Sequence, residues 1–412
     1  MKYGLIGEKL GHSFSAEIHG RLFDYHYELK ELSPDELADF ICNQEFVGIN
    51  VTIPYKEAVI PLLDEVDPVA KRIGAVNTVV NRNGKRIGYN TDYFGLKAMI
   101  EYAGISLADK TVLILGSGGT SKTALAVAKD LGCREAKRVS RAKKDDCITY
   151  NQAKSQYAGA EILINTTPCG MFPKVCESVV NLVDFPSCEG VVDVVYNPLR
   201  TQLVCEALSQ GVPAVGGLYM LIAQAARAAE LFTGVSVPVE KIKTIYNDLI
   251  AKKQNIVLIG MPGCGKSTVC QELANQLGLS FVDTDDEISL SEGRSISEIF
   301  ESEGEAYFRQ LETIVIQGVS SRQGCVIATG GGAILNPENI ANLRKNGRIF
   351  FLDRPLEMLI PTADRPLSMD RDALNQRYQE RYERYCRACD VRVDATITVS
   401  EIIKQIREDL RV

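Results

Sequence analysis

Two glycine-rich turns in the sequence have the residue types of phosphate-binding loops. One is Gly260-Met261-Pro262-Gly263-Cys264-Gly265-Lys266-Ser267-Thr268, and the other is Gly116-Ser117-Gly118-Gly119-Thr120-Ser121. The first matches the P-loop pattern, whose backbone N–H groups surround nucleotide phosphates while Lys266 contacts their outer oxygens and Ser267 ligates Mg²⁺. The second matches the less specific pattern of a dinucleotide-binding turn, for which a plain tight turn is the alternative. The sequence therefore predicts two nucleotide sites.

Basic residues after the second of these turns bear on the dinucleotide that it would bind. Ser140 and Arg141 end the next expected strand, and Lys143 and Lys144 follow. An NAD enzyme usually has a carboxylate here, which accepts hydrogen bonds from the ribose hydroxyls. Basic groups instead favour the 2′-phosphate of NADP, although a solvated run of charges is the alternative.

Both turns require a strand before them and a helix after them. Short apolar runs predict buried parallel strands, and periodic patterns at 120–131 and 267–277 predict helices. The predicted strands are Thr111–Leu115, Ile162–Asn165, Val191–Val195, Asn255–Ile259, Cys325–Ala328 and Ile349–Leu352. Strands and helices that alternate in this way predict an α/β fold. A polar stretch, 251–254, separates a helical pattern from the strand at Asn255 and is the predicted linker between two halves.

Length and composition limit the class of protein. A chain of 412 residues is longer than one hydrophobic core usually supports, which favours two or three domains. The net charge of −7 argues against a nucleic-acid-binding protein. No stretch is long enough to span a membrane, no signal peptide is apparent, and the twelve scattered cysteines fit a reducing compartment. We therefore expect a cytoplasmic protein without nucleic-acid or membrane partners.

Motifs before and after the dinucleotide turn resemble the shikimate dehydrogenase family over about residues 1–250. They are Gly11-His12-Ser13-Phe14-Ser15, Asn50-Val51-Thr52-Ile53-Pro54-Tyr55-Lys56, Gly74-Ala75-Val76-Asn77-Thr78, Asn90-Thr91-Asp92, Asn165-Thr166-Thr167, Tyr196-Asn197-Pro198 and Leu221-Ile222-Ala223-Gln224. The resemblance implies that Lys56 and Asp92 are catalytic. It implies substrate contacts from Ser13, Ser15, Thr52, Asn77, Tyr196 and Gln224. It implies NADP contacts from residues 116–121, Arg141, Val194 and Gly217.

The implied chemistry explains the catalytic residue types. Transfer of a hydride from NADPH to a ring ketone builds negative charge on the ketone oxygen, which a cationic proton donor such as Lys56 stabilises. Asp92 can orient this ammonium and accept a hydrogen bond from a ring hydroxyl. An ion pair at the protein surface is the alternative interpretation of these two residues.

Motifs downstream of the P-loop resemble the shikimate kinase family over about residues 255–412. They are Phe281-Val282-Asp283-Thr284-Asp285, Gly304-Glu305-Ala306-Tyr307-Phe308-Arg309, Thr329-Gly330-Gly331-Gly332, Arg365-Pro366-Leu367, and Arg381 with Tyr385. The resemblance implies that ATP is bound by Gly263, Cys264, Gly265, Lys266, Ser267, Thr268 and, on a mobile lid, Arg365. It implies that shikimate is bound by Asp285, Arg309, Gly331 and Arg381. Lys266 and Asp285 would be catalytic, and Mg²⁺ would be held by Ser267 and, through water, by Asp283.

Shikimate is a carboxylate that carries hydroxyls, so Arg309 and Arg381 can bind its anionic end by charge-assisted hydrogen bonds. Asp285 can then accept the proton of the reacting hydroxyl. The resemblances imply a substrate domain at 1–100, completed by helices at about 218–250, a Rossmann NADP domain at 101–217 and a P-loop kinase domain with a parallel sheet at 255–412. The implied function is reduction of 3-dehydroshikimate to shikimate by NADPH, then phosphorylation of the shikimate 3-hydroxyl by ATP, in a monomer or homodimer.

Other functions remain open from the sequence. The dehydrogenase could prefer quinate, or it could prefer NAD. Ser140 and Asp145 bear on the cofactor, because they replace an asparagine and a lysine that the family usually carries. A decayed enzyme that senses shikimate is a second alternative, although the four catalytic groups are all present. A nucleotide-driven switch with a protein partner is a third, but the arginines fit a small anion better. In the kinase half, Pro361 stands where the family tends to carry an arginine near the adenine.

Overall fold

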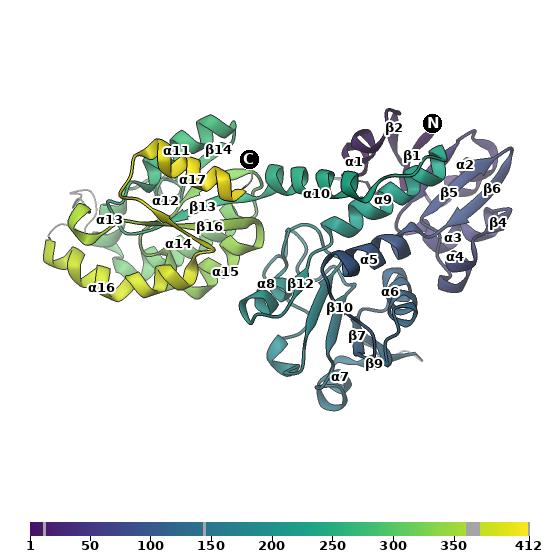
Figure 1. The fold of residues 1–412 in the computed structure, drawn as a ribbon, viewed down its shortest axis with the longest axis horizontal. Coiled ribbons are helices and arrows are strands. Elements are labelled where there is room, and N and C mark those ends of the chain that lie inside the picture. The colour runs from purple at the N-terminus through teal and green to yellow at the C-terminus, as the bar shows by residue number, and fades with distance from the viewer. Residues whose placement is uncertain (11–13, 143–145, 360–370, 411–412) are drawn as a thin grey trace. The chain divides into compact units, whose positions relative to one another are not determined.

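The computed structural model describes residues 1–10, 14–142, 146–359 and 371–410, without the side chains of residues 371 and 373. The described residues form two compact units, Met1–Asp248 and Leu249–Val412. They contain three β-sheets, two in the first unit and one in the second, with helices packed against them (Figure 1). The predicted α/β class is therefore confirmed.

The first sheet is mixed, with the strand order β2-β1-β3-β5-β6-β4. Its strands are β1 (Tyr3–Gly7), β2 (Tyr27–Glu31), β3 (Gly48–Val51), β4 (Glu65–Val66), β5 (Thr78–Arg82) and β6 (Lys85–Tyr89). Its helices are α1 (Ser15–Leu22), α2 (Glu36–Asn43), α3 (Tyr55–Ala58) and α4 (Pro68–Ile73). Asn83 and Gly84 both have positive φ and form the tight turn of the β5–β6 hairpin. Because β3 and β6 are both antiparallel to β5, their carboxyl ends lie at the same edge of the sheet.

The second sheet is parallel throughout, with the order β12-β11-β10-β7-β8-β9. Its strands are β7 (Thr111–Leu115), β8 (Glu135–Ser140), β9 (Cys147–Thr149), β10 (Ile162–Asn165), β11 (Gly190–Asp193) and β12 (Ala214–Val215). Its helices are α6 (Gly119–Asp130), α7 (Tyr150–Gln156) and α8 (Gln202–Ser209). The strand order reverses between β7 and β10, and ligands of such sheets bind at the carboxyl ends of the strands beside this point. The turn after β7 that begins at Gly116 lies there.

Two helices, α5 (Thr91–Tyr102) and α9 (Leu218–Thr233), lie side by side between the two sheets of the first unit (Figure 1). A β-carbon on Gly95 of α5 would lie 2.7 Å from the Met220 carbonyl oxygen and 2.9 Å from Gln224 Cβ. The helices can therefore pack this closely only because Gly95 has no side chain. This packing places the first turn of α5 beside Gln224.

The predicted linker at 251–254 is mostly helical, which corrects the expectation of a separate polar connection. Helix α10 (Val239–Lys253) continues through its first three residues, and the Gln254 N–H still donates to the Ile250 carbonyl. Alanine and lysine favour helices, and Lys252 and Lys253 suit the negative end of the helix dipole. Sequence polarity alone therefore did not mark the end of this helix.

The second unit contains one parallel sheet with the order β14-β15-β13-β16-β17. Its strands are β13 (Asn255–Ile259), β14 (Ser280–Asp283), β15 (Cys325–Ala328), β16 (Gly347–Asp353) and β17 (Val391–Asp394). Its helices are α11 (Lys266–Leu277), α12 (Thr284–Glu292), α13 (Ile296–Ser302), α14 (Gly304–Ser320), α15 (Pro337–Asn346), α16 (Arg371–Ala388) and α17 (Val399–Leu410). All residues of β13 and β15 are buried, as expected for strands covered on both faces. The turns that follow β13, β14 and β15 meet at one edge.

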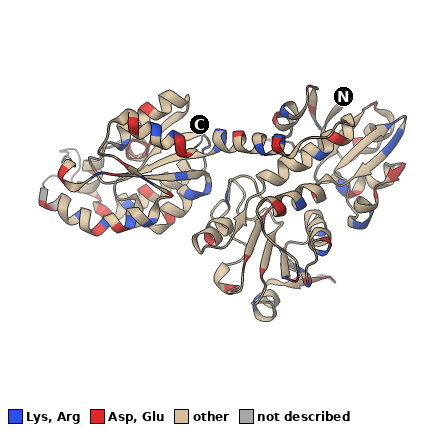
Figure 2. Cartoon of the chain, in the orientation of Figure 1, with Lys and Arg blue, Asp and Glu red and all other residues tan. Residues whose placement is uncertain are grey.

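Charged side chains of both signs are interspersed over the helices, as α16 illustrates (Figure 2). In Figure 2 basic and acidic residues are mixed along the ribbon, and the whole sequence carries a net charge of −7. Within the described ranges, no helix combines the length and apolar character needed to cross a membrane.

Candidate active sites

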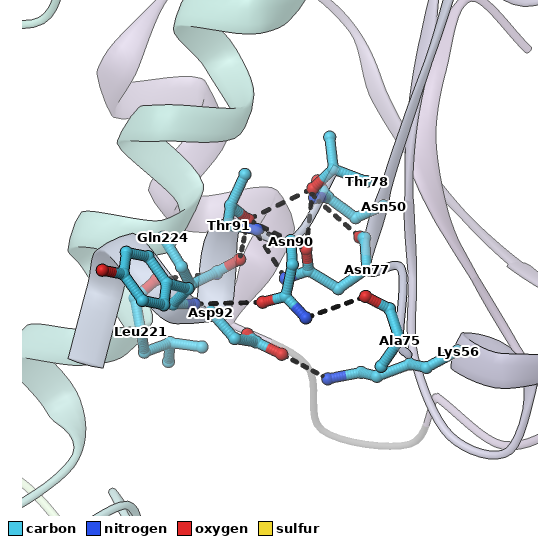
Figure 3. A network of polar contacts seen from close by, with 11 residues as sticks. Asn50, Lys56, Ala75, Asn77, Thr78, Asn90, Thr91, Asp92, Leu221 and Gln224 are labelled. Atoms are coloured by element: carbon cyan, nitrogen blue, oxygen red, sulfur yellow. Dashed lines mark hydrogen bonds and ion pairs between the residues drawn. The ribbon is translucent and has the colours of Figure 1, made fainter. Parts of the chain in front are cut away.

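An ion pair between Lys56 and Asp92 is the centre of the first site. Lys56 Nζ lies 2.6 Å from Asp92 Oδ2, with 23% and 13% of the two side chains exposed (Figure 3). Lys56 belongs to α3, which follows β3, and Asp92 to the first turn of α5, which follows β6. The Asn90 side chain caps α5 by accepting from the Tyr93 N–H, so the Asp92 carboxylate lies at the positive end of the helix. The sheet topology thus brings together two residues far apart in sequence.

A buried network of amides and hydroxyls fixes the start of α5 (Figure 3). Asn77 Oδ1 accepts from the Thr91 N–H at 2.7 Å, and Asn77 Nδ2 donates to Thr91 Oγ1 at 3.0 Å. Asn50 Nδ2 donates to Thr78 Oγ1 at 3.0 Å, and Gln224 Oε1 lies 3.4 Å from Thr91 Oγ1. These contacts join β3, β5, α5 and α9. Because buried amides in such a network have few alternative partners, they hold the neighbouring Asp92 in place.

A cavity of about 430 Å³ opens beside the ion pair, within the size range of small-molecule sites. Predicted residues that line it are Ser15, Thr52, Lys56, Asn77, Asp92, Thr120, Val194, Tyr196, Gly217 and Gln224. The structure thus brings together the predicted substrate residues except Ser13, which lies outside the described residues. Burial raises the pKa of Tyr196, whose ring makes an edge contact with Phe14.

Some residues of this cavity have no predicted role. Lys9 lines it from the segment after β1, and Leu10, Met220 and Leu221 supply apolar surface. Asn50 lies within a predicted motif, but its place in the hydrogen-bond network follows only from the fold. A lone lysine outside a motif has no sequence signal that separates it from a solvated surface charge.

Substitution of Gly95 by alanine is expected to disturb this site by separating α5 from α9. The added methyl group would meet the backbone of Met220, so we expect a loss of about 1–3 kcal/mol in unfolding free energy. Thermal denaturation of the full chain measures this loss as a lower Tm.

The matched control is Gly20→Ala in α1, where an added β-carbon meets nothing within 4 Å. Alanine stabilises a helix more than glycine does, so this control is expected to keep or raise the Tm. Equal Tm values for the Gly95 variant and the unchanged chain would contradict the close packing.

A second cavity, of about 990 Å³, surrounds the turn after β7. Predicted NADP residues that line it are Gly116, Ser117, Gly118, Gly119, Thr120 and Arg141. Thr120 lines both cavities, which therefore adjoin. Ser121 is buried and donates to the Gly118 carbonyl at 2.7 Å, so its side chain supports the turn without lining either cavity. Lys143 and Lys144 lie outside the described residues.

Other residues of the second cavity are apolar or have no predicted role. Ile53, Met171 and Phe172 line it with 74%, 44% and 48% of their surface exposed. Lys174 lines it too and pairs with Glu177. Exposed apolar side chains of this kind suit the flat rings of a dinucleotide.

The P-loop of the second unit follows β13 and leads into α11. Gly263 and Gly265 have φ angles of 79° and 92°, in the left-handed region where glycine is favoured. Lys266 is 5% exposed, and its ammonium donates to the carbonyls of Gly260 at 2.8 Å and Met261 at 3.1 Å. Cys264 is buried within the loop. The loop therefore has the backbone geometry of a phosphate cradle with a lysine at its centre.

Two hydroxyl-bearing residues of the P-loop, Ser267 and Thr268, are exposed in the first turn of α11. Ser267 Oγ donates to Asp283 Oδ2 at 2.7 Å. Asp283 also caps α12 by accepting from the Asp285 N–H at 3.0 Å. The hydroxyl and the carboxylate predicted to hold Mg²⁺ are thus adjacent.

The triple-glycine turn after β15 is packed between the other predicted groups. A β-carbon on Gly330 would lie 2.6 Å from Asp285 Oδ1, and one on Gly332 would overlap the Arg309 guanidinium. A β-carbon on Gly331 would lie 2.8 Å from Pro262 of the P-loop. The turn is therefore more than a plain reversal of the chain, because it brings the P-loop, Asp285 and Arg309 close together.

The remaining predicted residues converge on the same turn. Arg381 Nη1 and the Tyr385 hydroxyl donate to the Gly331 carbonyl at 3.1 and 2.5 Å. Arg309 pairs with Glu312 at 2.9 Å, and Glu312 is 1% exposed with its pKa raised by burial. Sequence reasoning missed Glu312, although its position three residues after Arg309 on one helix was a usable signal. Arg365 and Pro361 lie outside the described residues.

Some polar atoms of this cluster are buried without a hydrogen-bond partner among the described residues. Among them are the Nε donor of Arg381 and the Oε1 acceptor of Glu312. Unsatisfied groups of this kind are costly, and they commonly mark the place of a ligand. A ligand that satisfies both must offer an acceptor and a donor, as a hydroxylated acid does.

Family models match three segments of the chain. Residues 5–79 match the shikimate dehydrogenase substrate binding domain, residues 217–244 the shikimate 5′-dehydrogenase C-terminal domain, and residues 262–411 shikimate kinase. The first two segments contain residues of the first cavity. The third contains the triple-glycine turn and most of the P-loop.

Relatives of known function match the N-terminal part of the chain. It is 37% identical over 268 residues to the shikimate dehydrogenase (NADP(+)) of Clostridium perfringens, with 60% of this chain and 97% of that protein covered. The solved shikimate dehydrogenase 1 of Peptoclostridium difficile is 38% identical, with a TM-score of 0.55 and coverage of 60% and 98%. The Thermus thermophilus shikimate 5-dehydrogenase in complex with NADP(H) and shikimate is 28% identical, with a TM-score of 0.55 and coverage of 60% and 99%.

Proposed function

Because the chain belongs to the shikimate dehydrogenase family in its N-terminal part and carries a shikimate kinase domain after it, we propose that it performs two consecutive reactions. The first is the reversible, NADPH-dependent reduction of 3-dehydroshikimate to shikimate. The second is the transfer of a phosphoryl group from ATP to the 3-hydroxyl of shikimate. The observation that carries the first reaction is the Lys56–Asp92 contact beside the cavity.

Lys56 is the group that we assign to proton transfer in the first reaction. As a hydride adds to the carbonyl carbon, the oxygen becomes negative and takes a proton from the lysine ammonium. Asp92, 2.6 Å away, orients the ammonium and can accept a hydrogen bond from a neighbouring ring hydroxyl. Tyr196 and Gln224 line the same cavity and offer polar groups to the rest of the acid.

The two adjoining cavities fit an elongated dinucleotide. NADP(H) supplies or accepts the hydride when it is bound. The turn at 116–119 and Arg141 line the larger cavity, whereas Val194 and Gly217 line the smaller one beside Lys56. Residues predicted to contact the cofactor therefore reach from a phosphate-binding turn to the place where hydride transfer must occur. The exposed Arg141 supports a preference for the 2′-phosphate of NADP over NAD.

The second unit supports phosphoryl transfer to a small acid. Arg309 and Arg381 would bind the carboxylate, and Asp285 would accept the proton of the attacking hydroxyl. Lys266 would stabilise the charge on the transferred phosphoryl group, which is the main catalytic demand of this reaction. The Ser267 hydroxyl and the Asp283 carboxylate, 2.7 Å apart, fit the shell of a hydrated Mg²⁺ ion. Such an ion would neutralise phosphate charge.

We further propose a cytoplasmic enzyme that acts as a monomer or homodimer. The twelve cysteines all lie within the described residues, and none of them forms a disulfide, as expected in a reducing compartment. Shikimate is favoured over quinate only by the family resemblance, and comparison of the two acids as substrates tests this choice.

A one-pot assay tests the whole proposal. Purified chain, 3-dehydroshikimate, NADPH, ATP and Mg²⁺ are combined, and NADPH consumption and shikimate 3-phosphate formation are followed together. We expect NADPH to be consumed first and phosphorylated product to follow. Omission of ATP should leave shikimate as the product, and omission of NADPH should prevent both changes.

A chain that binds shikimate yet neither oxidises nor phosphorylates it would instead be a sensor.

Replacement of 3-dehydroshikimate by shikimate isolates the kinase step, and replacement of NADPH by NADH measures the cofactor preference. Equal rates with NADH and NADPH would contradict the role of Arg141.

A further inference from the structure

Arg354 lies beside the P-loop and has no role in the function proposed above. It directly follows β16, the strand that pairs with β13 in parallel. A β-carbon on Gly265 would lie 3.9 Å from Arg354 Nη1, which is the nearest atom outside the loop's own neighbouring residues. A β-carbon on Gly260 would lie 2.9 Å from the Leu352 carbonyl oxygen. The end of β16 therefore lies beside the P-loop, with the Arg354 guanidinium next to Gly265.

The Arg354 guanidinium has no ion-pair or hydrogen-bond partner within the described part of the chain, and its Nε atom is buried. The neighbouring carboxylate, Asp353, is already bound by Arg392 and by the Tyr382 hydroxyl. The P-loop has a cation of its own, Lys266, whose ammonium donates to backbone carbonyls. A half-buried guanidinium without a counter-ion is unfavourable unless an anion completes its environment.

From this position we propose that Arg354 binds the phosphate chain of the nucleotide held by the P-loop. The inference rests on the proposed kinase function and adds a second cation to that site. A P-loop presents its N–H groups to the phosphates from one side, and Lys266 acts from its centre. Arg354 contributes from the β16 side, where its planar guanidinium can form two parallel hydrogen bonds to phosphate oxygens.

Calorimetric titration of the full chain with ATP and Mg²⁺ measures this contribution directly and does not require turnover. Arg354→Met is expected to raise the Kd for ATP about 10- to 100-fold, as the loss of a charge-assisted contact implies. The Kd for shikimate should stay within about twofold of its original value, because Arg354 does not contact the acceptor cluster. Arg354→Lys keeps the charge without the planar geometry, so its Kd for ATP should lie between those of the unchanged chain and Arg354→Met.

Arg387→Met is the matched control, because it removes an exposed guanidinium of α16 that is not near the P-loop glycines. Its Kd for ATP should equal that of the unchanged chain. The Kd for ATP should rise with ionic strength in the unchanged chain, and this rise should be smaller in Arg354→Met. A loss of packing alone would not change the dependence on salt. If Arg354→Met lowers the Tm, Arg354→Gln keeps polar bulk at the site and gives the same comparison.

An ATP Kd that is unchanged in Arg354→Met and Arg354→Gln overturns the inference, as does an equal weakening of ATP and shikimate. A chain that does not bind ATP at all overturns it too. If ATP binds and depends on Arg354 but no shikimate is phosphorylated, the inference stands and the proposed kinase function fails.

Discussion

Replacement of Lys56 by methionine is expected to slow the reduction of 3-dehydroshikimate about 10²–10⁴-fold, the usual contribution of a positioned proton donor. The methylene chain is kept, but the ammonium that contacts Asp92 at 2.6 Å is lost. Because a group acting mainly in the transition state affects turnover, kcat should fall more than KM rises. Steady-state rates of NADPH oxidation measure both constants.

Phosphorylation of shikimate by the same variant should continue at the original rate, since Lys56 lies in the other compact unit. Lys71→Met, which removes an exposed lysine from α4, is the matched control and should leave the reduction rate unchanged. A Lys56→Met chain that keeps its Tm and at least half of its kcat would show that another group donates the proton.

The complementary substitution, Lys266→Met, is expected to lower kcat/KM for phosphorylation about 10²–10³-fold or more, as for other preorganised groups that stabilise transition-state charge. Lys266 is 5% exposed and lies at the centre of the P-loop. Its loss also leaves the carbonyls of Gly260 and Met261 without this donor, so a modest fall in Tm should accompany the kinetic effect.

Coupled detection of ADP measures this kinase loss, and NADPH oxidation by the same sample reports whether the first unit is intact. Lys404→Met removes a lysine of α17 whose side chain is 76% exposed and provides the control. If both activities fell together in Lys266→Met, the halves would depend on one another and the separate assignment of the two sites would be wrong.

The parts of the fold that the sequence predicts well are the buried parallel strands. Residues 112–115 and 256–259 are all apolar, and the structure places the strands Thr111–Leu115 and Asn255–Ile259 there. The glycine-rich turns were predictable for a related reason, since few residue types allow backbone N–H groups to surround a phosphate. These signals depend on contacts within a short stretch of chain.

Other features depend on contacts between distant segments and gave weaker signals. The mixed sheet of the first unit was not predicted, because Thr78–Arg82 and Lys85–Tyr89 contain polar residues and do not form continuous apolar runs. Lys9 and Arg354 are charged residues outside the motifs, and only the fold places them beside a cavity or a P-loop. The roles assigned to individual site residues stay predictions until the variants are measured.

A β-carbon on Gly331 would lie 2.8 Å from the Pro262 ring, so the triple-glycine turn approaches the P-loop this closely only because Gly331 has no side chain. A single added methyl group would push these two loops apart, whatever its chemical nature. New acceptor molecules are therefore easier to accommodate by changes at Arg309 or Arg381 than by changes in the turn. In the proposed phosphoryl transfer, the distance between the P-loop and the acceptor would therefore depend on the main chain, whereas the choice of acceptor would depend on side chains that can be exchanged.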